Sequence, residues 1–297
     1  MKNGFLTHSA PKNHTNKLMW RVASAMLAGI ALLFAFQGFT RAEDDDHDHE
    51  ATAISDCSVT FMINNHGRYF LANDLKQCPG VGISINVSDV KLELRGHTIQ
   101  GTAPASTIIL VNGGTTGISN IEIAGPGTVT GGAAAGIELD YVQHSRVHNL
   151  VVVGNGVTPG PTDGIDVFAG DRTTPSTTAA TASTDNEFRD NVITANFGFG
   201  IQVDGGNGNR FIHNNLSGNT LDGLFLRTAD NNVVRQNTID SNGQFGIEVG
   251  TGSGNMIEGN TALGNLTDLL DNNITCANTW INNSFNSNTS GAPGCIQ

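Results

Sequence analysis

Apolar residues return at a fixed interval of 23 positions through the second half of the chain. One series is Phe188, Phe211, Val234, Ile257 and Trp280, and another is Ile193, Leu216, Ile239, Ala262 and Phe285. A Gly-apolar pair recurs in step with them, at residues 200–201, 223–224 and 246–247. Apolar and polar residues alternate over the next few positions, as in "GIQVD" and "GIEVG". The pattern predicts short strands with one buried face, repeated once per period.

Asparagine keeps the same step of 23 residues. The three series are Asn186, Asn209, Asn232, Asn255 and Asn278; Asn191, Asn214, Asn237, Asn260 and Asn283; and Asn196, Asn219, Asn242, Asn265 and Asn288. Asn and Gly suit bends that need a left-handed backbone, whereas a helix would have to carry them against their propensities. Short strands joined by such bends predict a parallel β-solenoid, in which each Asn hydrogen-bonds to its equivalent in the next coil.

Composition agrees with one repetitive domain. The 297 residues include 37 glycines and only 8 prolines, and 14% are charged. A solenoid grows by adding coils and needs no second core. The net charge of −12 excludes a nucleic-acid partner, because no basic stripe is present to neutralise phosphates.

The N-terminus resembles a secretory signal. Lys12, Lys17 and Arg21 precede an apolar run at 22–36, and a small residue, Ala42, stands before an acidic tract. We therefore predict a signal peptide over 1–42 and an exported protein, periplasmic or extracellular, with no membrane contact after cleavage. An uncleaved anchor is the alternative, although the run is short for a membrane span.

The tract "EDDDHDHE" follows at 43–50. Its composition predicts a solvated, disordered acidic leader over 43–56. The alternative is a loose chelating tract for copper, zinc or nickel, with His47 and His49 as the candidate metal ligands.

The four cysteines lie in two pairs at the ends of the periodic region, which suits an oxidising compartment. Solenoid ends expose an apolar cross-section and need caps. Of three possible pairings we choose the local one, Cys57–Cys78 and Cys276–Cys295. The predicted organisation is an N-terminal cap over 57–82, coils over 83–275, and a C-terminal coil and cap over 276–297.

Two segments resemble a known group of proteins. Residues 67–101, "GRYFLANDLKQCPGVGISINVSDVKLELRGHTIQG", look like the first segment of bacterial right-handed parallel β-helix (PbH1) repeat proteins, and residues 276–297 resemble their end. The resemblance implies an all-β, single-domain right-handed β-helix of the pectate-lyase-like superfamily. That superfamily includes polysaccharide lyases, polygalacturonases, uronan epimerases and a periplasmic protein of copper-enzyme maturation.

One catalytic element of these families has a partial counterpart. "PTDGID", at 161–166, resembles the "NTDGID" element of polygalacturonases, which implies a catalytic role for Asp163. The Gly-His-Gly and Arg-Ile-Lys elements of those enzymes, and the epimerase run Tyr-Gly-Phe-Asp-Pro-His, are absent from the sequence. The resemblance therefore supports the fold more strongly than an activity.

The period is broken at one place. The step from Gly136 to Gly164 is 28 residues and the step from Gly164 to Gly200 is 36, so insertions flank the strand "GIDVF" on both sides. Insertions in solenoids form loops on one face, often the binding face. We therefore predict a groove around residues 164–168.

Outward side chains on neighbouring coils define the candidate site. At the sheet spacing, Glu138 and Asp166 would lie about 5 Å apart, and Asp166 and Asp204 about 8 Å apart, a separation compatible with inverting glycoside hydrolysis. Asp166 and Asp204, with Asp163, are the candidate catalytic residues. The candidate substrate-binding residues are Glu138, Asp140, Phe168, Phe225 and Arg227. The alternative is that these carboxylates are ordinary solvated groups and that Asp204–Arg227 is an ordinary ion pair.

Two functions follow from this site. The first is an exported protein that binds, and cleaves or epimerises, an extended polysaccharide, with Ca²⁺ as a candidate cofactor because two carboxylates could share a cation. The second is a non-catalytic exported scaffold, or a periplasmic protein that binds copper or another metal. In either case we expect a monomer.

Overall fold

The computed structural model describes residues 51–102, 107–156, 162–168, 170–171, 174–175 and 182–297. The described residues all belong to one compact unit, Asp48–Gln297. The predicted signal peptide and the acidic tract at 43–50 lie outside them. The described part of the chain contains no helix that is long and apolar enough to cross a membrane.

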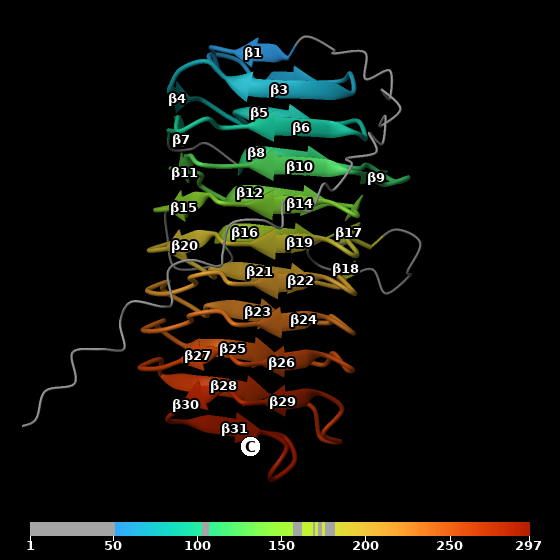
Figure 1. Cartoon of the computed structure of the whole chain (residues 1–297), viewed down its shortest axis with the longest axis vertical. Coiled ribbons are helices and arrows are strands. Elements are labelled where there is room, and N and C mark those ends of the chain that lie inside the picture. The colour runs from blue at the N-terminus through green and yellow to red at the C-terminus, as the bar shows by residue number, and fades with distance from the viewer. Residues whose placement is uncertain (1–50, 103–106, 157–161, 169, 172–173, 176–181) are drawn as a thin grey trace, which may run out of the picture. The chain divides into compact units, whose positions relative to one another are not determined.

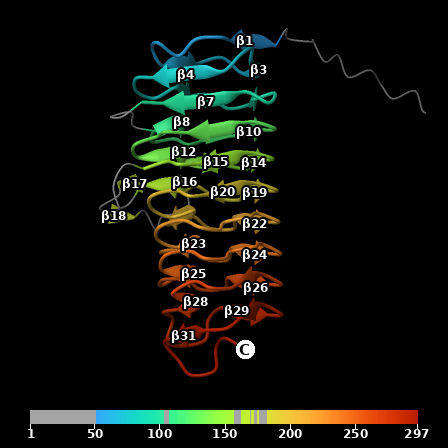
Figure 2. The same cartoon turned by 90° about the vertical axis from the view of Figure 1, so that its left-hand side faces the viewer.

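The described unit is a parallel β-helix, as the sequence predicted (Figures 1 and 2). Each coil contributes one strand to each of two ten-stranded sheets, called sheet A and sheet B. Sheet A consists of β1 (Thr52–Ile54), β3 (Gly67–Leu71), β6 (Val90–Glu93), β10 (Ile121–Ala124), β14 (Arg146–His148), β19 (Glu187–Arg189), β22 (Arg210–Ile212), β24 (Val233–Arg235), β26 (Met256–Glu258) and β29 (Thr279–Ile281).

Sheet B forms the opposite wall. It consists of β2 (Phe61–Ile63), β5 (Ile83–Ile85), β8 (Thr107–Asn112), β12 (Ala135–Asp140), β16 (Asp163–Phe168), β21 (Ile201–Asp204), β23 (Leu224–Leu226), β25 (Phe245–Val249), β28 (Thr267–Asp271) and β31 (Asn288–Ser290). From Ile83 onward sheet B has nine strands, one for each coil.

A third wall, sheet C, is narrower. It contains β4 (Leu75–Cys78), β7 (Thr98–Gly101), β11 (Thr128–Thr130), β15 (Val151–Val153) and β20 (Val192–Thr194). Single bridges continue it through Asn215 and Thr238 to β27 (Thr261–Ala262), which pairs with β30 (Ser284–Phe285). Two small pairs complete the described strands: β9 (Ile118–Ser119) with β13 (Val142–Gln143), and the antiparallel β17 (Gly170–Asp171) with β18 (Thr174–Pro175).

The predicted asparagine ladders are present. The backbone N–H of Asn214 donates to Oδ1 of Asn237 at 2.8 Å, and Asn237 repeats the bond to Asn260 at 2.9 Å. Most side-chain amides also donate inward to a backbone carbonyl, as Asn237 does to Phe211 at 2.9 Å. Most ladder residues are buried, and Asn265 and Asn283 are partly exposed. Their side-chain oxygens therefore accept, at each corner, from backbone N–H groups that the sheets leave without partners.

The left-handed positions are one residue away from where we expected them. The ladder asparagines themselves do not have positive φ; the residue before nearly all of them does, for example Asp190 (φ 54°) before Asn191 and Gln236 (φ 54°) before Asn237, whereas before Asn278 it is Cys276 (φ 49°), two residues back. The bend belongs to that preceding residue, and the Asn that follows it turns its amide into the coil.

The third ladder ends differently from its sequence series. Asn265 donates to Oδ1 of Asp268, at 3.1 Å from its backbone and 3.0 Å from its side chain. Asn288, the expected partner, is exposed in β31, opposite Leu269. The prediction for Asn288 is therefore wrong, because the last coil is shorter than 23 residues.

Glycine at the start of the sheet B strands allows close packing against a ladder. A Cβ on Gly223 would lie 2.8 Å from the amide nitrogen of Asn242, and one on Gly200 would lie 2.8 Å from that of Asn219. The recurring Gly-apolar pair thus marks where the ladder passes directly behind the strand.

Both predicted disulfides are formed, Cys57–Cys78 and Cys276–Cys295. Each lies near one end of the described coils. The prediction of a disordered leader over 43–56 is wrong for its last part, since β1 pairs with β3 and forms the first strand of sheet A. Ile54 is fully buried in β1, which explains the ordering of this segment.

Candidate functional site

The outer face of sheet B carries the predicted site. Asp166 on β16 lies between Glu138 on β12 and Gln202 on β21 in the register of the sheet. Phe168 likewise lies between Asp140 and Asp204. The outward residues that the repeat predicts to be neighbours on successive coils are therefore aligned in the sheet.

The centre of this face is buried, although an open groove was expected. Asp163 and Asp166 have no exposed surface, and Phe168 is only 5% exposed. Asp163 accepts a hydrogen bond from the backbone N–H of Phe199 at 3.2 Å, one coil further on. A bound polysaccharide would not reach these carboxylates as they stand. The two insertions that were expected to wall the groove lie largely outside the described residues.

Asp204 forms an ion pair. Nη1 of Arg227 lies 2.8 Å from Oδ2 of Asp204, and the carboxylate is 1% exposed whereas the arginine side chain is 43% exposed. Thr228 adds a longer contact to Oδ1 at 3.4 Å. A carboxylate already engaged by a guanidinium is not available to contact a substrate. The pairing therefore favours the structural interpretation of Asp204.

Glu138 and Asp140 form the more accessible edge of the site. Both are partly exposed, and the hydroxyl of Thr107 donates to Oε2 of Glu138 at 2.7 Å. Burial, and then the charge of Glu138, raise the pKa of Asp140 to about 6. No Arg or Lys of the described chain offsets that repulsion through an ion pair to Asp140.

Sequence reasoning missed a second carboxyl pair on the same face, Asp222 and Glu248. Asp222 is fully buried immediately before β23, and Glu248 lies outward on β25 in the next coil. Burial raises the pKa of Asp222 to about 8, with a further contribution from the charge of Glu248. The outward positions compared from coil to coil did not include Asp222, because it stands three residues before Phe225.

Two aromatic rings pack together close to this carboxyl pair, since Phe225 lies opposite Glu248. Phe225, predicted to bind substrate, packs against Phe199 with ring centroids 5.3 Å apart and planes at 34°. Both are partly exposed.

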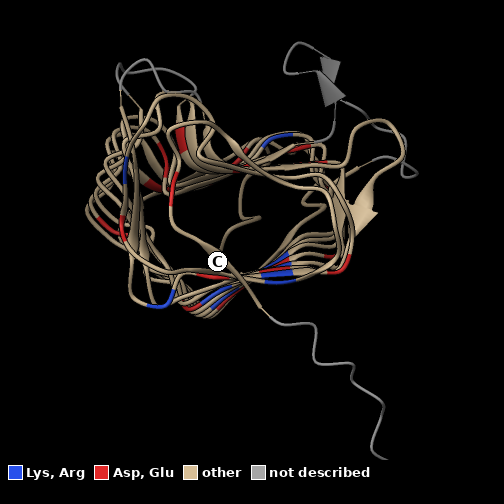
Figure 3. Ribbon diagram, turned by 90° about the horizontal axis from the view of Figure 1, so that it is seen from above, with Lys and Arg blue, Asp and Glu red and all other residues tan. Residues whose placement is uncertain are grey.

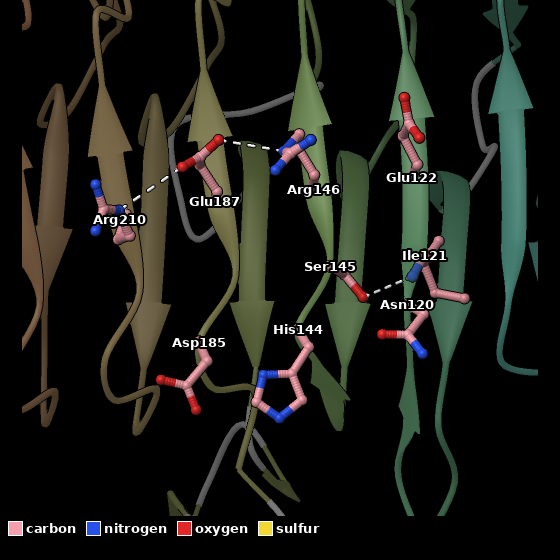
Figure 4. A pocket seen from close by; sticks show the side chains of 9 residues that line it. All are labelled: Asn120, Ile121, Glu122, His144, Ser145, Arg146, Asp185, Glu187 and Arg210. Atoms are coloured by element: carbon pink, nitrogen blue, oxygen red, sulfur yellow. Dashed lines mark hydrogen bonds and ion pairs between the residues drawn. The ribbon is translucent and has the colours of Figure 1, made fainter. Parts of the chain in front are cut away.

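A second region, on the outer face of sheet A, contains a hollow of about 440 Å³ (Figure 4). Its lining residues are Asn120, Ile121, Glu122, His144, Ser145, Arg146, Asp185, Glu187 and Arg210. Glu187 lies between two arginines, with Arg146 Nε at 3.2 Å and Arg210 Nε at 3.7 Å. The guanidinium groups are thus already neutralised, and the hollow offers a mixed polar surface. The 23-residue repeat did not indicate this hollow. Its charged lining residues, such as Arg146, Glu187 and Arg210, alternate in sign from coil to coil and resemble ordinary surface ion pairs.

Charge is unevenly distributed around the coils (Figure 3). Most described Lys and Arg residues project from sheet A or the turns beside it: Arg68, Lys91, Arg95, Arg146, Arg189, Arg210 and Arg235. On the outer face of sheet B, Arg227 is the one described cation. The same face has six acidic residues: Glu138, Asp140, Asp166, Asp204, Asp222 and Glu248. Such a face attracts cations and repels polyanions.

The comparison with protein families decides the assignment. The family described as periplasmic copper-binding protein (NosD) matches residues 105–293, well over half of the chain. The chain belongs to the NosD family. A comparison with curated protein sequences gave no match.

Solved structures resemble this NosD-family chain in fold alone. The A-module of the mannuronan C-5 epimerase AlgE4 of Azotobacter vinelandii is 13% identical, with a TM-score of 0.51, over 80% of this chain and 79% of that one. ORF18 of Geobacillus virus E2 is 13% identical, with a TM-score of 0.53, over 81% of this chain. The match spans about half, 52%, of the viral protein.

No group of three or more His, Cys, Asp or Glu side chains within the described coils is placed to hold a metal ion. The histidines near carboxylates contact one each, as His148 does with Glu122 at 3.1 Å. Among the metal-ligand candidates from the sequence, His47 and His49 lie outside the described residues. Family membership and the two disulfides nevertheless indicate an exported protein.

Proposed function

We propose that this NosD-family protein is a periplasmic copper-binding protein in which the β-helix is a non-catalytic scaffold. The observation that carries the proposal is the burial of Asp166, the central carboxylate of the predicted catalytic site, which has no exposed surface. Its neighbour Asp204 is neutralised by Arg227. Acid–base chemistry on a polysaccharide requires carboxyl groups within hydrogen-bonding reach of the substrate. The family description supports copper as the ligand.

We assign the copper to the leader rather than to the coils. Cu²⁺ binds well to imidazole together with oxygen ligands. The tract at 43–50 places His47 and His49 two residues apart among five Asp and Glu neighbours within "DDDHDHE". The described coils offer isolated histidines, and the acidic face of sheet B contains carboxyl groups without imidazole. The donor chemistry of the leader therefore fits copper better than that of any described surface.

A copper titration of the secreted, full mature chain tests this proposal. We expect Cu²⁺ binding by calorimetry, with nitrogen coupling in the electron paramagnetic resonance spectrum from imidazole ligands. The double variant His47→Ala, His49→Ala should lose most of the affinity. His213→Ala is the matched control, because His213 is an exposed histidine that contacts Gln236 at 2.8 Å. Unchanged affinity in the double variant would place copper elsewhere, and no binding by the native chain would refute the proposal.

Polysaccharide binding is the second candidate function. The Phe199–Phe225 ring pair, partly exposed beside Arg227, favours it, since aromatic faces stack on sugars and an arginine can pair with a uronate. The acidity of the surrounding face opposes a polyanionic ligand unless Ca²⁺ mediates the contact. A panel of neutral and uronate polysaccharides, with and without Ca²⁺, tests it on the native chain and Phe225→Ala. Binding that Phe225→Ala retains would exclude this surface.

A further inference from the structure

A diagonal contact recurs across the outer face of sheet B. The residue at the beginning of one coil's strand touches an outward residue three positions further along in the next coil. Thr107 and Glu138 make this contact through a hydrogen bond of 2.7 Å. Phe199 and Phe225 make it through their rings, 5.3 Å apart. In both cases the partners are chemically complementary: a donor meets an acceptor, or a ring meets a ring.

Asp222 and Glu248 occupy the same diagonal, but both carry carboxyl groups. Register fixes their relation, because Phe225 lies opposite Glu248 and Asp222 precedes Phe225 by three residues. Their side chains interact directly. Two carboxylates have only acceptor oxygens, so a hydrogen bond between them requires a proton on one of them.

The surroundings of Asp222 indicate which group carries the proton. Oδ1 of Asp222 accepts a hydrogen bond from the backbone N–H of Phe245 at 3.0 Å. Oδ2 is buried, and no N–H or hydroxyl group of the described residues donates to it. Glu248 is partly exposed, and its Oε1 accepts a hydrogen bond from Nδ2 of Asn272 at 2.9 Å. The buried group without a second donor is the one better suited to be the neutral acid.

We propose that Asp222 and Glu248 form a proton-binding pair in which the neutral carboxyl of Asp222 donates to Glu248 and so joins the outer edges of β23 and β25. In this arrangement protonated Asp222 donates a hydrogen bond to Glu248, as the Thr107 hydroxyl donates one to Glu138 between β8 and β12. Loss of the proton leaves two like charges in contact, one of them buried, and drives the Glu248 side chain toward solvent. The pair therefore makes this part of the face sensitive to alkaline pH.

The electrostatic environment is consistent with a shared proton. Burial, followed by the charge of Glu248, raises the pKa of Asp222 to about 8, and burial also raises the pKa of Glu248. The neighbouring strands bring no charge that would offset this: β21 contributes Gln202 and Asp204, and β28 contributes Leu270. The one cation nearby, Arg227, is engaged by Asp204.

A carboxyl-carbon NMR titration of the full chain tests the proposal, with resonances assigned through variants. We expect one aspartate resonance to titrate near pH 8 and to vanish in Asp222→Asn. In Glu248→Gln the new amide can donate to Asp222, so the midpoint of Asp222 should fall from about 8 toward the ordinary 3.8. Glu258→Gln, an outward residue of sheet A paired with Arg235 at 3.1 Å, is the control and should leave the midpoint unchanged.

The outcomes separate clearly. If the resonance that disappears in Asp222→Asn titrates below pH 6 in the native chain, the shared proton does not exist. The proposal is also overturned if Glu248→Gln leaves that midpoint near 8, because the elevation would then owe nothing to Glu248. The Glu248→Gln measurement follows the one aspartate resonance that titrates near pH 8, so this part of the test does not depend on the folding of Asp222→Asn. It is also independent of copper binding by the leader.

Discussion

Asn214 and Asn237 are joined across adjacent coils by two hydrogen bonds to the same atom. Oδ1 of Asn237 accepts from the backbone N–H of Asn214 at 2.8 Å and from its Nδ2 at 3.1 Å. Asn237 then donates from its own amide to the carbonyl of Phe211 and to Asn260, both at 2.9 Å. One side chain thus satisfies buried groups in three successive coils, so each ladder couples the stability of a coil to both its neighbours.

Replacing Asn237 with Ala should therefore be strongly destabilising. The change leaves the Asn214 backbone N–H without a partner in the interior, at about 1–3 kcal/mol, and removes the hydrogen bonds of the Asn237 side chain to Phe211 and Asn260. We expect the free energy of unfolding to fall by about 3 kcal/mol or more, measured by denaturant unfolding. Asn288→Ala is the matched control, because Asn288 belongs to a sequence series but is exposed and outside the ladder. Equal effects of the two substitutions would contradict the structural role of the ladder.

The two disulfides should differ in their sensitivity to reduction. Cys57 and Cys78 are buried, whereas Cys276 is exposed and Cys295 partly exposed. Under limiting reductant we expect the C-terminal bridge to open first, as followed by alkylation and peptide mapping. Each bridge closes a loop of about 20 residues and should stabilise its cap by about 3 kcal/mol in the chain-entropy treatment. A thermal midpoint that full reduction leaves unchanged would argue against that stabilisation.

Asp166→Asn distinguishes a scaffold from an enzyme. If the β-helix is a non-catalytic scaffold, this variant should bind Cu²⁺ with native affinity, since Asp166 is buried and distant in sequence from His47 and His49. It should also leave any polysaccharide binding intact. A sharp loss of polysaccharide binding or turnover would instead restore the catalytic interpretation of residues 164–168. Calorimetry and the polysaccharide panel provide the measurement.

The repeat predicted the architecture because periodicity reports on what is equivalent from coil to coil. Asn214, Asn237 and Asn260 are equivalent, and they stack as expected. Periodicity does not report what covers a face, and for that reason the burial of Asp166 was not foreseen.

The repeat also conceals relations between positions that are not equivalent. Asp222 and Glu248 are 26 residues apart, one period plus three, so a comparison of equivalent positions never places them together. The prediction for the last coil was wrong for a related reason. Asp268 can replace an asparagine as the acceptor for Asn265, and a sequence series cannot show such a substitution when it also shifts the spacing.

Asp140 should make stability depend on pH within a narrow window. Burial and the charge of Glu138 raise its folded-state pKa to about 6, above the ordinary 3.8, so the folded protein binds this proton more tightly than the unfolded chain. The resulting stabilisation is complete below about pH 4, declines as the pH rises to about 6, and is constant above that. Asp140→Asn removes the titrating group and should therefore remove its contribution to the change in the free energy of unfolding between about pH 4 and pH 6.

Thermal unfolding of the native chain and Asp140→Asn at half-unit steps from pH 4 to pH 9 provides the measurement. The difference between them should grow between pH 4 and pH 6 and then stay level, whereas the difference produced by Asp222→Asn should keep growing to about pH 8. The two carboxyl pairs on sheet B are therefore distinguishable by where their contributions stop changing. If Asp140→Asn tracks the native chain at every pH, the pKa of Asp140 is not raised in the folded protein.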